Sequence, residues 1–255
     1  MYAEERQQAI ASHVIAQGRA SVTELAEVYD VTTETIRRDL AILDKAGVLR
    51  RVHGGAVPVR ALRLVESAVG ERESTRAEYK DSIAAAAIDY LPPSGASVLI
   101  DAGTTTARMA AKLPTDREMT VVTNSIPVAA RLAGVRSVSL QMLGGRVRGL
   151  TQAVVGDQAL RVLNTLRVDV AFIGTNAISL RHGLSTPDGD EAAVKRAMVR
   201  CANYVVVLAD SSKVGREDFV SFASIGDVDV LITDLEVTDA DRDQLIGSGV
   251  EVVRA

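Results

Sequence analysis

The chain has 255 residues, a formal net charge of −4 and a hydrophobic content of 47%, which is enough apolar material to bury a core. Its overall negative charge excludes a protein that binds nucleic acid indiscriminately, because such binding depends on broad positive charge. The single cysteine, Cys201, excludes an internal disulfide framework and a zinc site of several cysteines, and it favours a reducing, cytoplasmic location. We expect no secretion signal and no membrane segment, because no apolar run is long enough to span a bilayer.

The first two predicted helices begin a small N-terminal domain. Residues 4–17 have helical periodicity, with Ile10 and Val14 on the inner face. Ser21 and Glu24 have the spacing of a capping box, in which the two side chains bond free amides at the start of a helix. A second, short helix is therefore expected to begin there.

A third helix is predicted from the stretch VTTETIRRDLAILDKAG, residues 31–47. Thr32 is placed to cap its start, because a threonine hydroxyl can accept a hydrogen bond from an amide of the first turn. Ile36, Leu40 and Leu43 recur at helical spacing and form one apolar face. The opposite face carries Glu34, Arg38 and Lys45, with Arg37 at its edge. One face therefore packs, and the other can contact a partner.

A small basic hairpin is predicted after this helix. Residues 48–52 have β character and include Arg50 and Arg51, and the pair Gly54-Gly55 after His53 favours a tight turn. An α-helix fits the major groove of DNA, and an arginine can bind a phosphate or a guanine edge through two hydrogen bonds. The alternative interpretation is a solvated charged helix beside an ordinary turn.

The local charge of this segment favours the DNA interpretation. Basic residues occur at Arg37, Arg38, Lys45, Arg50 and Arg51, against acidic residues at Asp39 and Asp44. Positive charge is thus concentrated in one place, as expected for a footprint on phosphate. The residues that we expect to contact DNA are Thr32, Thr33, Thr35, Arg37, Arg38, Arg50, Arg51 and His53. For His53, bracing of the turn is an equal alternative.

A larger α/β domain is predicted after a linker. Residues 59–76 have weak periodicity and mixed charge, which is typical of a linker with some helical character. An alanine-rich helix is expected over residues 78–91, with Ile83, Ala87 and Leu91 on one face. Short apolar runs then alternate with helical stretches, at residues 98–100, 120–122, 138–143, 168–173, 204–208, 230–232 and 250–253. Continuous apolar runs of this kind predict a largely parallel sheet that is covered on both faces.

Small and hydroxylic residues follow several of these runs. The turns are DAGTTT at 101–106, TNS at 123–125, GG at 144–145, GTN at 174–176 and DSSK at 210–213. In open parallel sheets the carboxyl ends of the strands form the ligand crevice, where the free amides of helix starts attract an anion. Lys213 adds a positive charge, which suits a phosphate better than a neutral sugar. Loop geometry alone explains any one of these turns, but five in succession favour a binding site.

Two groups of motifs resemble a known family. TIRRDL at 35–40 and RVHGGA at 51–56 resemble the winged helix-turn-helix of the DeoR family of bacterial transcription regulators. Thr32 is a departure, since the family usually has serine there, although both residues cap helices. The strand-end turns and GLSTPDGDEAAVKRA at 183–197 resemble the family's effector domain. That domain is related in fold to ribose-5-phosphate isomerase and glucosamine-6-phosphate deaminase, and it is taken to sense phosphorylated sugars.

The resemblance implies roles for residues of the larger domain. Asp101, Gly103, Thr104 and Thr105 would bind the phosphate, Thr123 and Asn124 would contact the sugar, and Glu191 and Lys213 would close the site. Thr106, Gly144, Gly145 and Gly174 complete the set of expected effector-binding residues. We expect no cofactor, no metal site and no catalytic residue.

The predicted organisation is a winged helix-turn-helix domain at residues 1–58, a linker at 59–76 and an α/β effector domain at 77–255. The effector domain is expected to have a mostly parallel sheet of the ribose-5-phosphate isomerase type. The predicted function is regulation of transcription, most simply repression, of sugar or polyol metabolism genes under the control of a phosphorylated sugar. The expected partners are double-stranded operator DNA, that effector, and further copies of the chain in a dimer or tetramer.

An active sugar-phosphate isomerase or deaminase with a DNA-binding appendage is the alternative. Such chemistry needs a positioned acid and base, often a histidine near the strand ends. His182 is the only histidine of the larger domain, and the Asp-Gly-His run of the deaminases is absent. Carboxylates at Asp101, Asp188, Asp190 and Glu191 leave room for residual chemistry, but binding without turnover is favoured.

Overall fold

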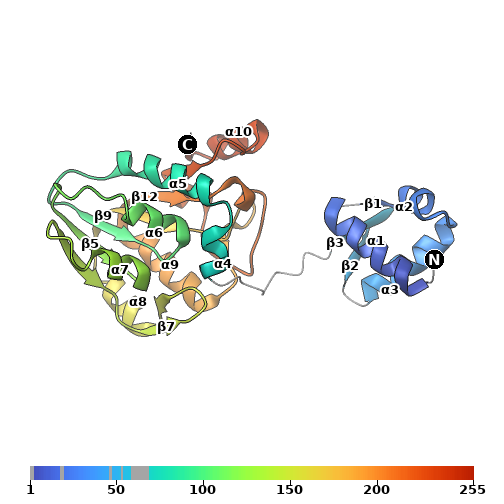
Figure 1. Ribbon diagram of the computed structural model, residues 1–255, viewed down its shortest axis with the longest axis horizontal. Coiled ribbons are helices and arrows are strands. Elements are labelled where there is room, and N and C mark those ends of the chain that lie inside the picture. The colour runs from blue at the N-terminus through green and yellow to red at the C-terminus, as the bar shows by residue number, and fades with distance from the viewer. Residues whose placement is uncertain (1–2, 18–19, 46–47, 53, 59–68) are drawn as a thin grey trace. The chain divides into compact units, whose positions relative to one another are not determined.

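The computed structural model describes residues 3–17, 20–45, 48–52, 54–58 and 69–255. The chain divides into two compact units, Met1–Ala61 and Leu62–Ala255, which Figure 1 colours blue and green to red respectively. The smaller unit has one buried apolar cluster and the larger unit has two. Among the described residues, no helix combines the length and apolar character needed to cross a bilayer.

The smaller unit contains three helices and a three-stranded antiparallel sheet. The helices are α1 (Ala3–Gln17), α2 (Val22–Tyr29) and α3 (Thr33–Lys45), and the strands are β1 (Ala20–Ser21), β2 (Leu49–Val52) and β3 (Gly55–Pro58). The capping box predicted at Ser21 and Glu24 is confirmed, and Ile10 and Val14 are fully buried. Strand β1 was not predicted, because two residues are too few to produce an alternating pattern.

The sheet order is β1-β3-β2, so β3 is paired on both sides. Gly55 allows this arrangement, since a Cβ atom at that position would lie 2.2 Å from the carbonyl oxygen of Ala20. Gly54 occupies the left-handed region at φ 83°, where glycine is the default residue. The glycine pair thus serves both the turn of the hairpin and its close approach to β1.

The larger unit begins with helices α4 (Val69–Ser74) and α5 (Ala77–Ala86), followed by the 3₁₀ helix η1 (Ala87–Tyr90). The sequence predicted an α-helix over 78–91, whereas the structure changes to 3₁₀ geometry at Ala87, just ahead of Pro92 and Pro93. Ile83, Ala87 and Leu91 are all buried, as their spacing predicted. Helix α4 lies inside the stretch that the sequence analysis treated as a linker.

A seven-stranded sheet forms the centre of the larger unit, and every neighbouring pair in it is parallel. Its strands are β4 (Ser97–Ile100), β5 (Met119–Thr123), β6 (Val138–Met142), β9 (Val168–Gly174), β12 (Ala202–Leu208), β14 (Val230–Thr233) and β15 (Glu251–Arg254). These are the seven runs predicted from the sequence. The prediction of a mostly parallel sheet is therefore confirmed.

Helices cover both faces of this sheet. Helices α5, α6 (Thr104–Ala110) and α7 (Ile126–Leu132) pack on one face, against side chains such as Val98 and Ile100. Helices α8 (Asp157–Leu163), α9 (Gly189–Cys201) and α10 (Asp239–Gly247) pack on the other, against Leu99. Burial on both faces explains why these strands are continuously apolar instead of alternating.

Five short strands lie outside the main sheet. They are β7 (Arg146–Arg148), β8 (Ala153–Val155), β10 (Ala177–Ser179), β11 (Gly183–Thr186) and β13 (Val220–Ala223). All pair in the antiparallel sense, in two small sheets, and none was predicted. Two more 3₁₀ turns, η2 (Ser211–Lys213) and η3 (Ile225–Asp227), follow β12 and β13.

The order of the main sheet is β15-β14-β12-β9-β4-β5-β6. The chain therefore starts at β4, moves outward to β6, returns to β9 on the other side of β4, and moves outward again. In open parallel sheets, ligands bind outside the carboxyl ends of the strands at such a reversal of direction. The topology thus marks the ends of β4 and β9 as the candidate site.

Candidate functional site

Helix α3 of the smaller unit presents an exposed cationic surface. Ile36 and Leu40 are fully buried, whereas Arg37 and Arg38 are exposed. The guanidinium of Arg37 lies 3.4 Å from the carboxylate of Glu34 one turn earlier, in a pair that is exposed on both sides. Exposed pairs of this kind contribute little energy, so the arginine can exchange its partner for a phosphate at small cost.

Thr32 and Thr35 lie at the start of α3. The hydroxyl of Thr32 accepts a hydrogen bond from the amide of Thr35 at 3.2 Å, and the two hydroxyls lie 2.9 Å apart. The cap predicted at Thr32 is therefore present. Thr33 is exposed and follows it directly. The start of the helix and its arginines thus form one accessible surface of the smaller unit.

Asp39 joins this helix to α1 on its buried side. Its carboxylate is buried and accepts hydrogen bonds from Arg6 Nε at 2.7 Å and Gln7 Nε2 at 2.9 Å, both on α1. Arg37 and Arg38 precede it directly in the sequence. The contact with α1 therefore sets the rotation of α3 that turns both arginines outward. The sequence analysis counted Asp39 only as an acidic residue and missed this contact.

The hairpin β2–β3 is formed as predicted, with Arg50 paired to Val57 and Arg51 paired to Ala56. Both arginines therefore lie on β2, beside the turn at Gly54. Their side chains, and His53 altogether, lie outside the described residues. Their expected contact with DNA remains a prediction.

In the larger unit, Asp101 joins the ends of β4 and β9. Its Oδ2 accepts a hydrogen bond from the amide of Gly174 at 3.0 Å and an ion-paired hydrogen bond from the ammonium of Lys195. Lys195 Nζ also donates to the carbonyl of Gly174 at 2.9 Å, and it lies 5.6 Å from the centre of the Phe222 ring. A buried ion pair therefore occupies the point where the strand order reverses.

Asp101 is fully buried. Burial raises the pKa of Asp101, and the ammonium of Lys195 and the amide of Gly174 oppose that rise. Its second oxygen, Oδ1, is buried and has no hydrogen-bond partner within the described part of the chain. Buried carboxylate oxygens are normally paired, so an acceptor is left available at this strand end.

Three of the expected effector-binding residues brace the loops around Asp101. Thr106 donates to the carbonyl of Asp101 at 2.7 Å, and Thr123 donates to the carbonyl of Ile100 at 2.6 Å. Asn124 accepts from the amide of Ala102 at 2.9 Å. These side chains hold the turn after β4 against the turn after β5. Their hydrogen-bonding capacity is thus largely used within the protein.

Gly103, Thr104 and Thr105 begin helix α6 next to this braced loop. Gly103 has extended backbone, and the two threonines are buried in the first turn. Gly174 is brought against Asp101, as described above. The structure thus gathers the residues expected at the ends of β4, β5 and β9 into one region.

Glu191 lies in a second cluster, at the start of α9. Its carboxylate accepts hydrogen bonds from Arg148 and from the hydroxyl of Thr151, and Arg148 Nε lies 3.3 Å from the carboxylate of Asp188. Gly145 begins the β7–β8 hairpin, where a Cβ atom would lie 2.5 Å from the carbonyl oxygen of Val155. Gly144 precedes it and is exposed. Gly145 therefore has a structural reason that is independent of any ligand.

Lys213 lies in a third cluster, on η2 after β12. Burial lowers its pKa, nearby Arg72 and Arg216 lower it further, and Asp210 opposes them. Burial likewise lowers the pKa of Lys80 to about 8, with Lys213 and Arg72 among the nearby cations. Two ammonium groups from distant parts of the sequence are therefore held near each other at the carboxyl edge of the sheet.

The chain matches two family descriptions, the DeoR-like helix-turn-helix domain at residues 6–60 and the DeoR C terminal sensor domain at residues 75–235. It is 39% identical over 249 residues to the HTH-type transcriptional regulator GlpR of Haloferax volcanii, covering 98% of this chain and 96% of the relative. The chain belongs to the DeoR family of transcriptional regulators.

The chain is also similar to a second curated relative and to a solved structure. The DeoR chain is 31% identical over 252 residues to a lactose phosphotransferase system repressor of Staphylococcus epidermidis, covering 98% of each. Among solved structures, ribose 5-phosphate isomerase A of Methanocaldococcus jannaschii aligns with 55% of each chain at a TM-score of 0.41 and 18% identity.

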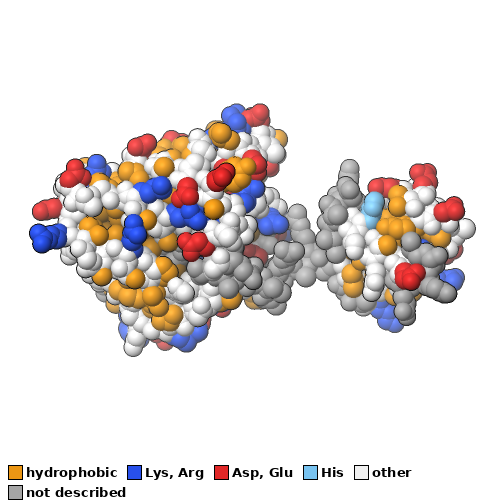
Figure 2. Space-filling view, viewed as in Figure 1, with side chains coloured by type: hydrophobic (Ala, Val, Ile, Leu, Met, Phe, Trp, Pro, Cys, Tyr) orange, Lys and Arg blue, Asp and Glu red, His pale blue; other side chains and the backbone are white. Residues whose placement is uncertain are grey.

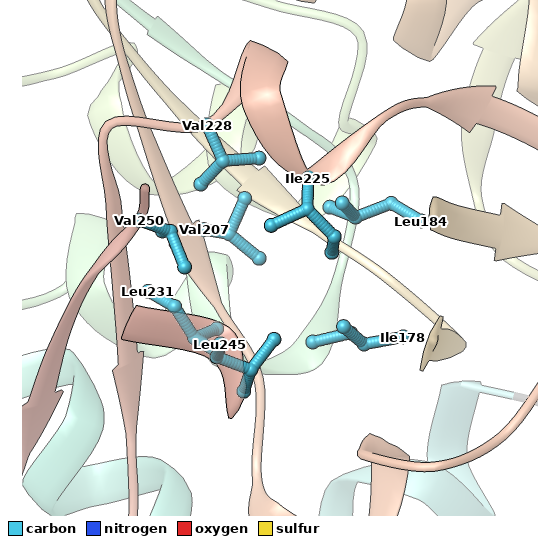
Figure 3. Close-up of a pocket in the computed structure, with 8 residues that line it drawn as sticks. All are labelled: Ile178, Leu184, Val207, Ile225, Val228, Leu231, Leu245 and Val250. Carbon is cyan, nitrogen blue, oxygen red and sulfur yellow. The ribbon is translucent and has the colours of Figure 1, made fainter. Parts of the chain in front are cut away.

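The DeoR sensor unit also has an apolar pocket, shown in Figure 3. Its lining consists of Ile178, Leu184, Val207, Ile225, Val228, Leu231, Leu245 and Val250. All of these side chains are buried and none can bind a phosphate or a hydroxyl group. This pocket is therefore part of the core and not the effector site. On the face of the sensor unit in Figure 2, basic and acidic side chains are interspersed.

The sequence analysis missed three residues that shape the sites of this DeoR protein. They are Asp39, Lys80 and Lys195, all buried although charged. A charged residue at an inward-facing helical position is the signal that could have revealed them, because burial of a charge requires a partner. Lys195 lay within the quoted motif at 183–197, but no role was assigned to it.

Proposed function

We propose that this DeoR-family protein represses genes of sugar or polyol metabolism and that a phosphorylated sugar, bound at the carboxyl edge of the sensor sheet, controls it. The observation that carries this proposal is the pair of ammonium groups of Lys80, which is buried, and Lys213, which is half-buried, near the end of β12. The name of one relative, a lactose phosphotransferase system repressor, supports the same class of effector.

The charge of this cluster favours an anionic ligand. Lys80 donates to the carbonyl of Arg72, and to that of Thr75 at 2.7 Å, but neutral carbonyls do not cancel its charge. Lys213 forms no salt bridge with any carboxylate in the described part of the chain, and Asp210 and Asp218 offset the positive groups around it at longer range. A phosphate near both ammonium groups would relieve their repulsion and form charge-assisted hydrogen bonds.

A second group of contacts would recognise the sugar. Asp101 lies at the switch point with one carboxylate oxygen unpaired, and the first turn of α6 beside it carries Thr104 and Thr105. A buried carboxylate oxygen without a hydrogen-bond partner costs free energy, and the hydroxyl groups of a sugar can donate to it. The unpaired oxygen of Asp101 is therefore suited to a polyhydroxylated ligand.

A thermal-shift screen with fructose, glycerol, deoxyribose and hexosamine phosphates tests this proposal. A ligand that binds the folded state raises its melting temperature by mass action. Replacement of Lys213 with methionine should weaken the best ligand by about 10- to 100-fold, the usual value of a hydrogen bond to a charged group. Lys112→Met, which removes an exposed cation after α6, is the matched control. Equal affinities of the two variants would place the phosphate elsewhere.

The DNA-binding form is proposed to be a homo-oligomer, either a dimer or a tetramer. One exposed helix and one short hairpin offer few contacts, and two linked heads multiply affinity without new contacts. Light scattering coupled to size-exclusion chromatography should give a mass of at least two chains. A monomer at the concentration that saturates operator DNA would contradict this part of the proposal.

We infer that the sensor unit binds its ligand without converting it. His182 Nε2 is engaged with the carbonyl of Asp218 at 3.1 Å, and Asp101 is tied to Lys195, so neither is poised as a free acid or base. Incubation with the same sugar phosphates, followed by NMR, should show no aldose–ketose conversion. Turnover at about 1 s⁻¹ or faster would establish an enzyme instead.

A further inference from the structure

Arg76, between α4 and α5, has a backbone conformation that its side chain does not favour. Its φ and ψ are 55° and 41°, in the left-handed region, where residues other than glycine are uncommon. No side chain caps α5 at this position. Such conformations persist only where surrounding contacts hold them. The contacts of the side chain therefore hold the backbone of Arg76 in this conformation.

The guanidinium of Arg76 gathers the loops that follow two strands of the main sheet. It donates to Ser211 Oγ at 2.9 Å and to Asp234 Oδ2 at 3.2 Å, after β12 and β14 respectively. It also donates to Glu236 Oε2 at 2.8 Å, and its Nε lies 3.2 Å from Asp210 Oδ1. One cation thus meets three carboxylates from two strand ends.

These partners are themselves organised. Asp234 is fully buried and accepts hydrogen bonds from the amides of Ser211, at 2.8 Å, and Glu236, at 2.9 Å. The aromatic ring of Tyr79 lies 4.3 Å below the guanidinium carbon, and its hydroxyl donates to Glu236. The position of Arg76 therefore depends on the arrangement of the strand-end loops, and not on a single exposed ion pair.

On the other side of the left-handed residue, backbone carbonyls of helix α4 and of Thr75 accept hydrogen bonds from side chains of the sensor unit. Lys80 binds the carbonyls of Arg72 and Thr75, and Arg108 donates to the carbonyl of Glu73 at 3.0 Å. Cations at the C-terminal end of a helix oppose the negative end of its dipole. If the backbone of Arg76 adopted the right-handed helical region, the break between α4 and α5 would be lost. The carbonyl contacts of Lys80 and Arg108 would then have to rearrange. The left-handed backbone of Arg76 and these carbonyl contacts therefore depend on each other.

We propose that Arg76 is a positioning residue that couples the carboxyl edge of the sensor sheet to α4, the element that follows the segment from the DNA-binding unit. The left-handed junction persists because the strand-end carboxylates hold the guanidinium. Asp210 and Ser211 belong to the same turn as Lys213, so an anion bound there acts on the partners of Arg76. This inference rests on the proposed function for the identity of that anion, but the coupling itself is a property of the chain.

Hydrogen exchange of the full-length chain, without ligand and without DNA, tests the coupling. Mass spectrometry of the peptide spanning residues 69–80 measures how fast its amide hydrogens exchange. The rate increases with the fraction of molecules in which α4 is open, so even rare opening is detected. We expect the slowest exchange in the unmodified chain, faster exchange in Arg76→Lys, and the fastest in Arg76→Ala. Arg76→Gly, which loses the side chain but tolerates the left-handed backbone, should exchange about tenfold more slowly than Arg76→Ala.

A change at the strand end distinguishes coupling from a merely structural role. Glu236 is exposed, so Glu236→Gln should fold normally and accelerate exchange in residues 69–80 by a few-fold. Asp243→Asn removes an equally exposed carboxylate on α10 and should leave that peptide unchanged. If Arg76 variants accelerate exchange but Glu236→Gln matches the control, Arg76 is structural only and the coupling is wrong. Unchanged exchange in every variant would also overturn it. Because no ligand is present, this result is independent of whether any sugar phosphate binds.

Discussion

Replacing Arg37 and Arg38 with alanine is expected to weaken operator binding by at least about 100-fold, since each arginine contact to a base or phosphate is worth roughly 1–3 kcal/mol. Both side chains are exposed on α3, and the apolar residues that hold the helix are untouched. The smaller unit should therefore stay folded. Gel-shift titration at a fixed salt concentration measures the loss, after selection of the operator from random duplexes.

The control for this prediction removes two positive charges from the sensor unit instead of from α3. Arg131→Ala combined with Arg136→Ala eliminates two exposed arginines of the sensor unit. That variant should bind the operator normally. If the effect came only from a lower total positive charge, both double variants would bind the operator more weakly. Near-normal binding by a folded Arg37→Ala and Arg38→Ala variant would remove α3 from the DNA interface. The slope of affinity against salt should also fall in the α3 variant, because fewer counterions are released.

Replacing Lys195 with methionine is expected to lower the free energy of unfolding of the sensor unit by about 3–5 kcal/mol, the usual cost of leaving one buried charge without its partner. Asp101 would keep the hydrogen bond from Gly174 but lose the ammonium that compensates its charge. Urea unfolding followed by circular dichroism measures the change. A loss of this size is a large part of the stability of an ordinary domain.

A double variant separates loss of the ion pair from loss of packing. In Asp101→Asn combined with Lys195→Met, the asparagine oxygen still accepts from Gly174, and no buried charge is left unpaired. The double variant should be more stable than Lys195→Met alone. If the two changes were simply additive, the cost would come from packing around Phe222 and not from the charge. Lys112→Met, at an exposed position, should leave the unfolding curve unchanged.

Local patterns were sufficient to predict the main elements. The capping box at Ser21, the helical face of Ile36 and Leu40, and the hydroxyl cap at Thr32 are encoded within a few residues of each other. The seven core strands were also predictable, because burial on both faces leaves a run of apolar residues that needs no partner to be recognised. Strands β1, β7, β8 and β10 have only two or three residues, and β11 and β13 contain glycine, serine or threonine, so none of them forms such a run.

The candidate sensor site was predicted only in part. The turns at Asp101 and Gly174 could be found, since small and hydroxylic residues after a strand mark the carboxyl edge of a sheet. The sequence could not predict that Thr106, Thr123 and Asn124 hydrogen-bond to backbone groups of these loops. A hydroxyl or amide at such a position can bind either a ligand or the backbone, and the sequence does not distinguish the two. Their partners are distant in the sequence.

By itself, the sequence determined the division into a basic helix-and-hairpin head and a parallel α/β sensor, because helical and strand periodicity, caps and turns are local properties. Only the tertiary structure decided which charges are buried together: Asp39 with Arg6, Asp101 with Lys195, and Arg76 with the carboxylates after β12 and β14. These pairs join residues that lie 33 to 160 positions apart. Desolvation makes a buried charge depend on its partner, and only the folding of the chain brings those partners together.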